Sequence, residues 1–401
     1  MGQYFQLIAP QAEMALSWCG KLGEILTEGS AKELVRLLAV PVRPQYDSPQ
    51  SSLVGSNNII CKEKRGAKRS RDDSNVHAGS PRCRKQIKVQ DRDEETTSSA
   101  VIGLSDLSVE LHRLIFSFMG NIGDVVALSI TSQYYLSIGR EYLEDYYTSQ
   151  LGLWAGTNIV CVGDYVEPND YPPGLFSNQR LEILRRMTIG PSEDCSDSDY
   201  EEAQNRPFTL FDFTNSNMST LIGTPSNSYD ISHSVMVSCL HRHITGDPGY
   251  DYIRRYNDML EKSETHFPTN QQWILRNLTT RQIVRSEAIA LSPEYISGPD
   301  IEVLGFGEVV MSRICWSTDS SVSMNDQTNI SRGVWAGHRF DITTLSRHKD
   351  ETRGEEWSDA SEEVAKEIAS IWEGEYGSNW REIICKEASR GYRNPATDWV
   401  I

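Results

Sequence analysis

Few side chains in this sequence have the types and spacing that metal or phosphate chemistry requires. Cys239, His241 and His243 alternate in the run SCLHRH and would share one face of a strand, but no fourth ligand follows in the sequence. The run GFGEV at 305–309 resembles a phosphate-binding glycine loop, yet it lacks a third glycine and the lysine and aspartate motifs of a kinase. We therefore predict no metal site, and we interpret 305–309 as a turn or bulge between two strands.

The motifs of common hydrolases are also missing. The chain has no G-x-S-x-G elbow, no H-E-x-x-H pair and no cysteine in the local context of a protease nucleophile. Its eight cysteines are scattered without a C-x-x-C pair, which is typical of reduced thiols in the cytosol or nucleus. We predict neither enzymatic activity nor a cofactor. The alternative, a small-molecule hydrolase or transferase in residues 150–401, requires an apolar pocket with convergent polar groups.

Side chains suited to protein recognition gather near residue 335. The run RGVWAGHRFDI at 332–342 brings together four of them: Trp335, His338, Arg339 and Asp341. Aromatic residues and arginine are favoured anchors in protein interfaces, so one interpretation is a recognition site in which Arg339 or Asp341 meets a side chain of a target. The other interpretation is a strand and turn that packs Trp335 and Phe340 into the core.

The most informative segment begins at Leu104 and reads LSDLSVELHRLIFSFMGNIGDVVALSITSQYYLSIG. Its apolar residues recur at helical spacing, and it resembles the F-box: a leucine-proline-x-glutamate-leucine opening, an isoleucine-phenylalanine pair, then a second helix that begins near an aspartate. The positions that match this pattern are Leu107, Glu110, Leu111, Ile115, Phe116, Phe118, Asp124, Val125, Leu128 and Thr131. Ser108 stands where the family usually has proline. Its hydroxyl can still start a helix by accepting a bond from an early amide, so the departure bears on affinity for the partner.

The resemblance implies a partner, because F-boxes dock on the Skp adaptor of cullin-RING ubiquitin ligases. About 40 residues in three short helices bury too little apolar surface to fold alone, so another surface must cover one side. The resemblance assigns nine residues to the adaptor contact: Leu107, Ser108, Val109, Glu110, Leu111, Ile115, Phe116, Val125 and Leu128. An ordinary helical hairpin packed on the chain's own C-terminal domain is the alternative.

The pattern of apolar and polar residues divides the chain into four parts. Residues 1–42 are predicted to be helical, with two amphipathic helices between residues 5 and 41. Residues 43–100 are rich in Ser, Asn, Lys, Arg and Asp and are predicted to be a disordered linker. Residues 101–148 contain the three helices of the F-box-like segment. Residues 149–401 are predicted to be a mixed α and β domain.

Within the C-terminal part, Val- and Ile-rich runs at 158–166 and 302–316 are bounded by Gly, Pro or Asn, which is typical of strands. A helix is predicted near the C-terminus, capped by Ser358 or Asp359 and ended by Gly374 or Gly377. Its apolar stripe is Val364, Ile368, Ile371 and Trp372.

The resemblance extends beyond the F-box-like segment. The phrases WAGTNIVCVGDY, SRICWSTDSSVSM, RGVWAGHRFDI and IWEGEYGSNW look like the C-terminal region of a family of uncharacterised fungal F-box proteins, which also begin with MGxYF. That family brings no known ligand. It implies that residues 1–42 and 148–401 belong to one folding unit, with residues 43–100 looped out between them.

Charge is distributed unevenly. The net charge of −17 disfavours nucleic-acid binding, and no apolar run approaches the roughly 18 residues of a membrane span. Residues 62–88 nevertheless carry a net charge of about +7, in two basic clusters with the layout of a bipartite nuclear import signal. A solvated linker is the alternative for this basic island. Residues 189–205 are predicted to be an exposed acidic loop, in which Ser192, Ser196 and Ser198 would suit a kinase that prefers acidic context.

We therefore predict an α+β protein of the nucleus or cytoplasm: a three-helix F-box preceded by a disordered basic linker and followed by a mixed α/β domain. Its F-box would bind the Skp adaptor and the cullin scaffold, and its C-terminal domain would bind an unknown target protein. Ubiquitin transfer would be accelerated by proximity alone. The runner-up is an F-box scaffold or regulator that delivers no substrate.

Overall fold

The computed structural model describes residues 2–27, 31–43, 103–190, 205–214, 219–221, 266–325 and 328–389. They belong to two compact units, one made of residues 1–44 and 116–401 and the other of residues 45–115. The predicted linker from residue 44 onward, with its basic island, lies outside the described residues, as does the acidic loop from 191 to 204. The same is true of Cys239, His241 and His243.

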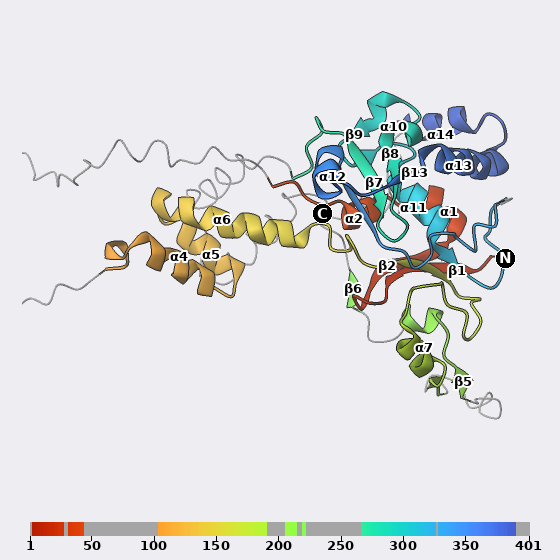
Figure 1. The fold of residues 1–401 in the computed structure, drawn as a ribbon, viewed down its shortest axis with the longest axis horizontal. Helices are drawn as coiled ribbons and strands as arrows, with labels where there is room; N and C mark the ends of the chain where they lie inside the picture. Colours follow the sequence, from red (N-terminus) through yellow and green to blue (C-terminus); the bar gives the residue numbers. More distant parts are fainter. Residues whose placement is uncertain are drawn as a thin grey trace, which may run out of the picture. The chain divides into compact units, whose positions relative to one another are not determined.

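A five-stranded mixed sheet contains the N-terminus (Figure 1). Its order is β11-β3-β1-β2-β6; the β1 pairs with β2 and β3 are antiparallel, whereas the β3–β11 and β2–β6 pairs are parallel. The strands are β1 (Tyr4–Ala9), β2 (Met14–Lys21), β3 (Val160–Gly163), β6 (Ser219–Leu221) and β11 (Cys315–Trp316). The predicted strand at 158–166 is therefore confirmed in its central part.

The prediction of a helix that starts near residue 5 is wrong, because residues 4–21 form the β1–β2 hairpin. The reason is that β1 is covered on both faces. Phe5 and Leu7 enter the main core, whereas Ile8 enters a second core on the opposite face of the sheet. A strand that is buried on both sides has a continuous apolar run, which periodicity cannot distinguish from a helix. The first two helices of the chain follow this hairpin: α1 (Leu22–Thr27) and α2 (Ala31–Leu38).

A second sheet has four strands in the order β12-β7-β8-β13. Residues at alternate positions of its two central strands point into the main core, among them Trp273, Leu275 and Val284. The helix α12 (Leu345–Glu351) follows β12 directly. The strands are β7 (Trp273–Asn277), β8 (Gln282–Arg285), β12 (Phe340–Thr344) and β13 (Ser358–Asp359).

The predicted strand at 302–316 is wrong for most of its length, and so is the turn predicted at 305–309. This region forms the helix α11 (Phe306–Ile314), which ends in the short β11. Gly305 precedes the helix, and its N–H donates to the Glu308 carboxylate at 2.8 Å. All nine residues of α11 are buried. A helix that is covered all round shows no polar face, so its sequence carries no helical period.

The C-terminal helices complete the main core. In α13 (Ser361–Tyr376), the predicted stripe is confirmed, because Val364, Ile368, Ile371 and Trp372 are all buried. The helix ends before Gly377, whose φ of 77° is in the left-handed region that favours glycine. At the other end, Asp359 Oδ1 accepts from Ser361 N at 3.0 Å. The helix α14 (Trp380–Ser389) then packs on α13.

The remaining elements are short, apart from the three helices of the F-box-like segment described below. The α+β class predicted from the sequence is confirmed, with several small mixed sheets surrounded by helices. Across the described ranges, no helix is long and apolar enough to cross a membrane. The short elements are α7 (Asn178–Leu184), β4 (Thr188–Ile189), β5 (Arg206–Pro207), η2 (Phe211–Thr214), α10 (Ser286–Ile289), η3 (Pro293–Tyr295), β9 (Ile296–Ser297) and β10 (Asp300–Ile301).

Candidate functional site

The segment that resembles an F-box forms a short 3-10 turn and three helices: η1 (Leu104–Asp106), α4 (Val109–Phe118), α5 (Ile122–Ser129) and α6 (Gln133–Gln150). Side-chain caps explain where two of the helices begin. Asn121 Oδ1 accepts from Gly123 N at 2.8 Å before α5, and Ser132 Oγ accepts from Tyr135 N at 3.2 Å before α6. The sequence therefore specifies the helix boundaries locally.

The interior of this helical bundle is closely packed. Phe116 is fully buried and its ring is stacked on Tyr142, with ring centroids 5.6 Å apart. Gly139 lets α5 and α6 approach each other, since a Cβ there would lie 1.8 Å from Ser129 Oγ. Val125 and Leu143 are also buried in this cluster. Phe116 and Val125, which the resemblance assigns to the adaptor contact, thus lie inside the bundle and hold it together.

The start of α4 shows how Ser108 acts in place of proline. The first helical bond runs from His112 N to Ser108 O at 3.1 Å, so the helix starts after Ser108 as predicted, through the backbone carbonyl of Ser108. The Ser108 hydroxyl donates to the Glu110 carboxylate, and this bond, together with the backbone N–H of Glu110, lowers the pKa of Glu110 below its ordinary value. The serine side chain therefore bonds to a neighbouring carboxylate, which proline cannot do.

The first half of α4 carries an unusually apolar exposed surface. Val109 and Leu111 are 40% and 45% exposed, and their neighbours Ser108 and Glu110 are exposed as well. The other predicted contact residues are half-buried: Leu107, Ile115 and Leu128. Four of the nine predicted residues therefore lie fully at the surface, and they are consecutive in the sequence.

Three further apolar residues at this surface are not among the nine that the resemblance assigns to the adaptor contact. Leu104 is 43% exposed, Leu114 is 49% exposed and Phe118 is 78% exposed. Leu111, Leu114 and Phe118 are spaced at i, i+3 and i+7, so they share one face of α4, and we call them the apolar strip of α4. This spacing is visible in the sequence, but the F-box pattern does not include Leu114. Leu104 precedes α4, and Val109 lies two positions before Leu111 and therefore on a different face.

The other end of α6 is joined to the body of the same unit. Glu144 Oε2 lies 3.0 Å from His266 Nε2, and both side chains are buried. The backbone of His266 accepts from Val42 N at 2.8 Å, and Trp154 N donates to Leu37 O at 2.9 Å. Segments far apart in the sequence therefore hold the C-terminal part of α6.

Two of the predicted recognition residues in 332–342 have structural roles. Trp335 is buried; its ring lies under the Arg313 guanidinium at 4.2 Å, and its indole N–H donates to Gln282 at 3.2 Å. Asp341 is also buried and accepts two bonds of 2.7 Å from Arg276. The interpretation in which Trp335 and Phe340 pack into the core is the one that the structure shows, since Phe340 is fully buried.

His338 and Arg339 are more accessible. The Nδ1 atom of His338 accepts from the Asn277 amide at 2.9 Å, and partial burial lowers the pKa of this histidine. Arg339 is exposed, and its backbone is fixed by Leu278 N, which donates to Arg339 O at 2.8 Å. Of the four predicted residues, Arg339 alone presents its side chain fully to solvent.

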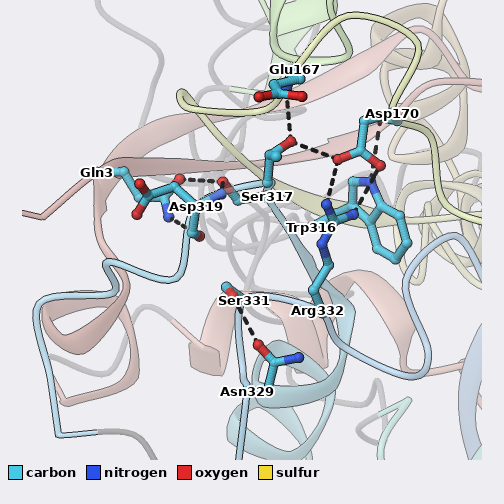
Figure 2. Close-up of polar contacts among 10 residues, drawn as sticks. Gln3, Glu167, Asp170, Trp316, Ser317, Asp319, Asn329, Ser331 and Arg332 are labelled. Atoms are coloured by element: carbon cyan, nitrogen blue, oxygen red, sulfur yellow. Dashed lines mark hydrogen bonds and ion pairs between the residues drawn. The ribbon is translucent and has the colours of Figure 1, made fainter.

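A polar network joins the loops that follow β3 and β11 (Figure 2). Asp170 accepts two bonds from Arg332, at 2.9 and 2.6 Å, and one each from Thr318 and the Trp316 indole. Burial by itself would raise the pKa of Asp170, but these bonds hold it below its ordinary value. Both carboxylate oxygens of Asp170 accept bonds from protein donors, so this network stabilises the two loops.

Within the described residues, no group of three or more His, Cys, Asp or Glu side chains is placed to hold a metal ion. No protein-family model, curated protein or solved structure matches this chain. The candidate site therefore depends on the geometry of α4 alone.

Proposed function

We propose that the chain is a substrate-recognition adaptor of a Skp-cullin-F-box ubiquitin ligase, in which α4 to α6 act as the F-box. The observation that carries this proposal is the exposed apolar strip of α4: Leu111, Leu114 and Phe118. Soluble proteins rarely leave a contiguous apolar strip uncovered unless it binds a partner.

Covering the apolar strip of α4 is energetically favourable because it removes apolar side chains from water. Full burial of a leucine side chain contributes about 1.5–3 kcal/mol, so covering two half-exposed leucines contributes roughly that amount in total. The other residues of the strip add to it, and the cost of association is subtracted. A groove on the adaptor that accepts an amphipathic helix by its apolar face would make this contact.

The second part of the proposal is that the unit of residues 1–44 and 116–401 binds a target protein. The chain itself breaks no bond; it raises the local concentration of the target near the ubiquitin-charged enzyme. Arg339, whose side chain is exposed on this unit, is of a type favoured in protein interfaces and supports this part of the proposal.

The test is co-purification of the full chain with purified Skp adaptor and cullin. We expect the double variant Leu111→Asp, Leu114→Asp to lose capture, because two carboxylates would have to be desolvated in the contact. Both side chains are exposed, so the fold is retained. The matched control is Ile183→Asp, which changes an equally exposed residue, at 47%, on α7.

Capture by the wild type and the Ile183 variant, but not by the double variant, supports the proposal. Equal capture by all three chains, or capture by none, contradicts it. If the wild type captures the adaptor and no protein then changes its lifetime when the strip is mutated, the protein is a regulator that delivers no substrate.

A further inference from the structure

One histidine of α12 is buried without a partner for one of its ring nitrogens. His348 is 7% exposed, and no hydrogen bond reaches its buried Nδ1 atom. A neutral imidazole tolerates this arrangement, because Nδ1 carries no hydrogen when the proton is on Nε2. An imidazolium has a hydrogen on both nitrogens, so protonation would place a buried N–H donor at Nδ1 with nothing to accept its bond.

The surroundings of His348 already hold a buried cation. Burial lowers the pKa of His348 below its ordinary value, and the positive charge of Arg276 on β7 lowers it further. Arg285 on β8 acts in the same direction, whereas Asp341 on β12 and Glu351 on α12 oppose it. Both carboxylates bind Arg276, at 2.7 and 2.9 Å, so they compensate the charge that is already present.

The ring of Trp357 contacts both groups. It packs edge-to-face on the His348 ring, with centroids 5.0 Å apart, and the Arg276 guanidinium lies 5.8 Å from the centroid of the same indole. Trp357 is half-buried and lies in the segment that joins α12 to β13, where its indole N–H donates to Glu355 at 3.4 Å. A positive charge on His348 would therefore lie beside that of Arg276, under one aromatic cover.

We propose that α12 is an acid-sensitive latch, in which protonation of His348 releases α12 and Trp357 from the side of β7 and β12 that carries Arg276 and Asp341. Both of these side chains are buried when the latch is closed, and release exposes them. The closed form is fully stabilised above the ordinary histidine pKa of about 6.5, and this stabilisation is lost as pH falls toward the lower folded pKa. The reason is that the released histidine binds a proton more readily than the buried one.

The carboxylate on α12 does not titrate in the same range of pH. Burial by itself would raise the pKa of Glu351, but hydrogen bonds from Arg347 and Arg276 hold it below its ordinary value. Glu351 therefore stays charged between pH 8 and pH 5. A transition of α12 in that range is assigned to the histidine.

The first measurement is the tryptophan emission of the full chain from pH 8 to pH 5. A protonated imidazole quenches an adjacent indole, so the contribution of Trp357, taken as the difference between wild type and Trp357→Phe, should fall with a midpoint below about pH 6.5. His348→Gln is neutral throughout and should lose this transition. The matched control is His338→Gln, which should keep it, because His338 is half-buried but lies before β12 and its Nδ1 accepts from Asn277.

The second measurement is hydrogen–deuterium exchange, read by mass spectrometry on peptides from residues 345–357. After correction for the intrinsic rate, exchange should be at least about threefold faster at pH 5.5 than at pH 7.5, since each pH unit below about 6.5 changes the opening equilibrium by up to about tenfold. Peptides from α13 are the internal reference and should show no such change. In His348→Gln, the two pH values should give equal exchange in residues 345–357.

The proposal is overturned if the Trp357 emission shows no transition, or a transition with its midpoint at or above pH 6.5. It is also overturned if exchange in residues 345–357 does not accelerate in acid, or accelerates equally in His348→Gln. If that variant does not fold, the midpoint and the exchange of the wild type still decide the outcome. These results are separate from the proposed function, because the latch lies outside α4 and its test uses no adaptor.

Discussion

Replacing Asp341 by alanine is expected to unfold the chain at a markedly lower temperature. Asp341 and Arg276 are buried, with side chains 9% and 6% exposed, and they share two bonds of 2.7 Å. Loss of one partner of a buried ion pair costs about 3–5 kcal/mol, because the other charge stays buried without compensation. Arg276 also contacts Glu351 at 2.9 Å, and Glu351 is 40% exposed. This second partner places the expected cost near the lower limit, at about 3 kcal/mol.

A cost of this size is measurable by thermal unfolding. For domains of 150–250 residues, 1 kcal/mol lowers Tm by about 2–4 °C, so the expected shift is roughly 6–12 °C. The control is Arg285→Ala, which removes an exposed ion pair and leaves the bond from Ser361 N to Asp359 in place. Asp359 and Arg285 are 2.7 Å apart, but their side chains are 43% and 45% exposed. An exposed pair contributes at most about 1 kcal/mol, so this variant should shift Tm by no more than about 4 °C.

The result that would refute this reasoning is an equal Tm for Asp341→Ala and Arg285→Ala. If Asp341→Ala also lost target binding while it kept the wild-type Tm, Asp341 would be a recognition residue. Arg339→Ala provides the complementary measurement, since Arg339 is exposed and its removal should leave Tm unchanged.

Two further predictions concern packing and pH. Gly139→Ala should lower the free energy of unfolding by about 1–3 kcal/mol, because the new Cβ would lie 1.8 Å from Ser129 Oγ. The control Gly120→Ala should be neutral, because a Cβ at that position would have no other atom within 4 Å. Equal Tm values for the two variants would contradict the close approach of α5 and α6. Asp170→Asn should be destabilising at pH 7 and less so in acid. The folded pKa of Asp170 lies below the unfolded value of about 4, so its stabilisation is present above that value and is lost as pH falls through the folded pKa. A Tm difference between wild type and variant that stays constant from pH 7 to pH 3 would contradict this.

The two wrong predictions of secondary structure share one cause. The runs at 5–21 and 302–316 each contain an element that is largely apolar and covered on both faces or all round: β1, apart from the exposed Tyr4, and α11. The first is a hairpin and the second is mainly helix, because β1 is paired with β2 and β3, whereas α11 packs against α2 and α13. Periodicity reports which face of an element meets water, so it carries no information where no face does.

The residues at 332–342 show the same limit of prediction from the sequence alone. The sequence places Trp335, His338, Arg339 and Asp341 together, but it gives no sign that Arg276, 65 residues away from Asp341, neutralises that carboxylate. Ion-pair partners across a sheet depend on strand register, here Asp341 opposite Arg276 in the β12–β7 pair.

The sequence by itself determined the features that depend on local chemistry. These are the caps at Asn121 and Ser132, the helix start after Ser108, and the buried stripe of α13, each set by residues within one or two turns of one another. Only the tertiary structure decided that Phe116 faces inward while Leu114 faces solvent. The physical reason is that the burial of a side chain depends on which remote segment packs against it, and the local sequence does not specify that segment.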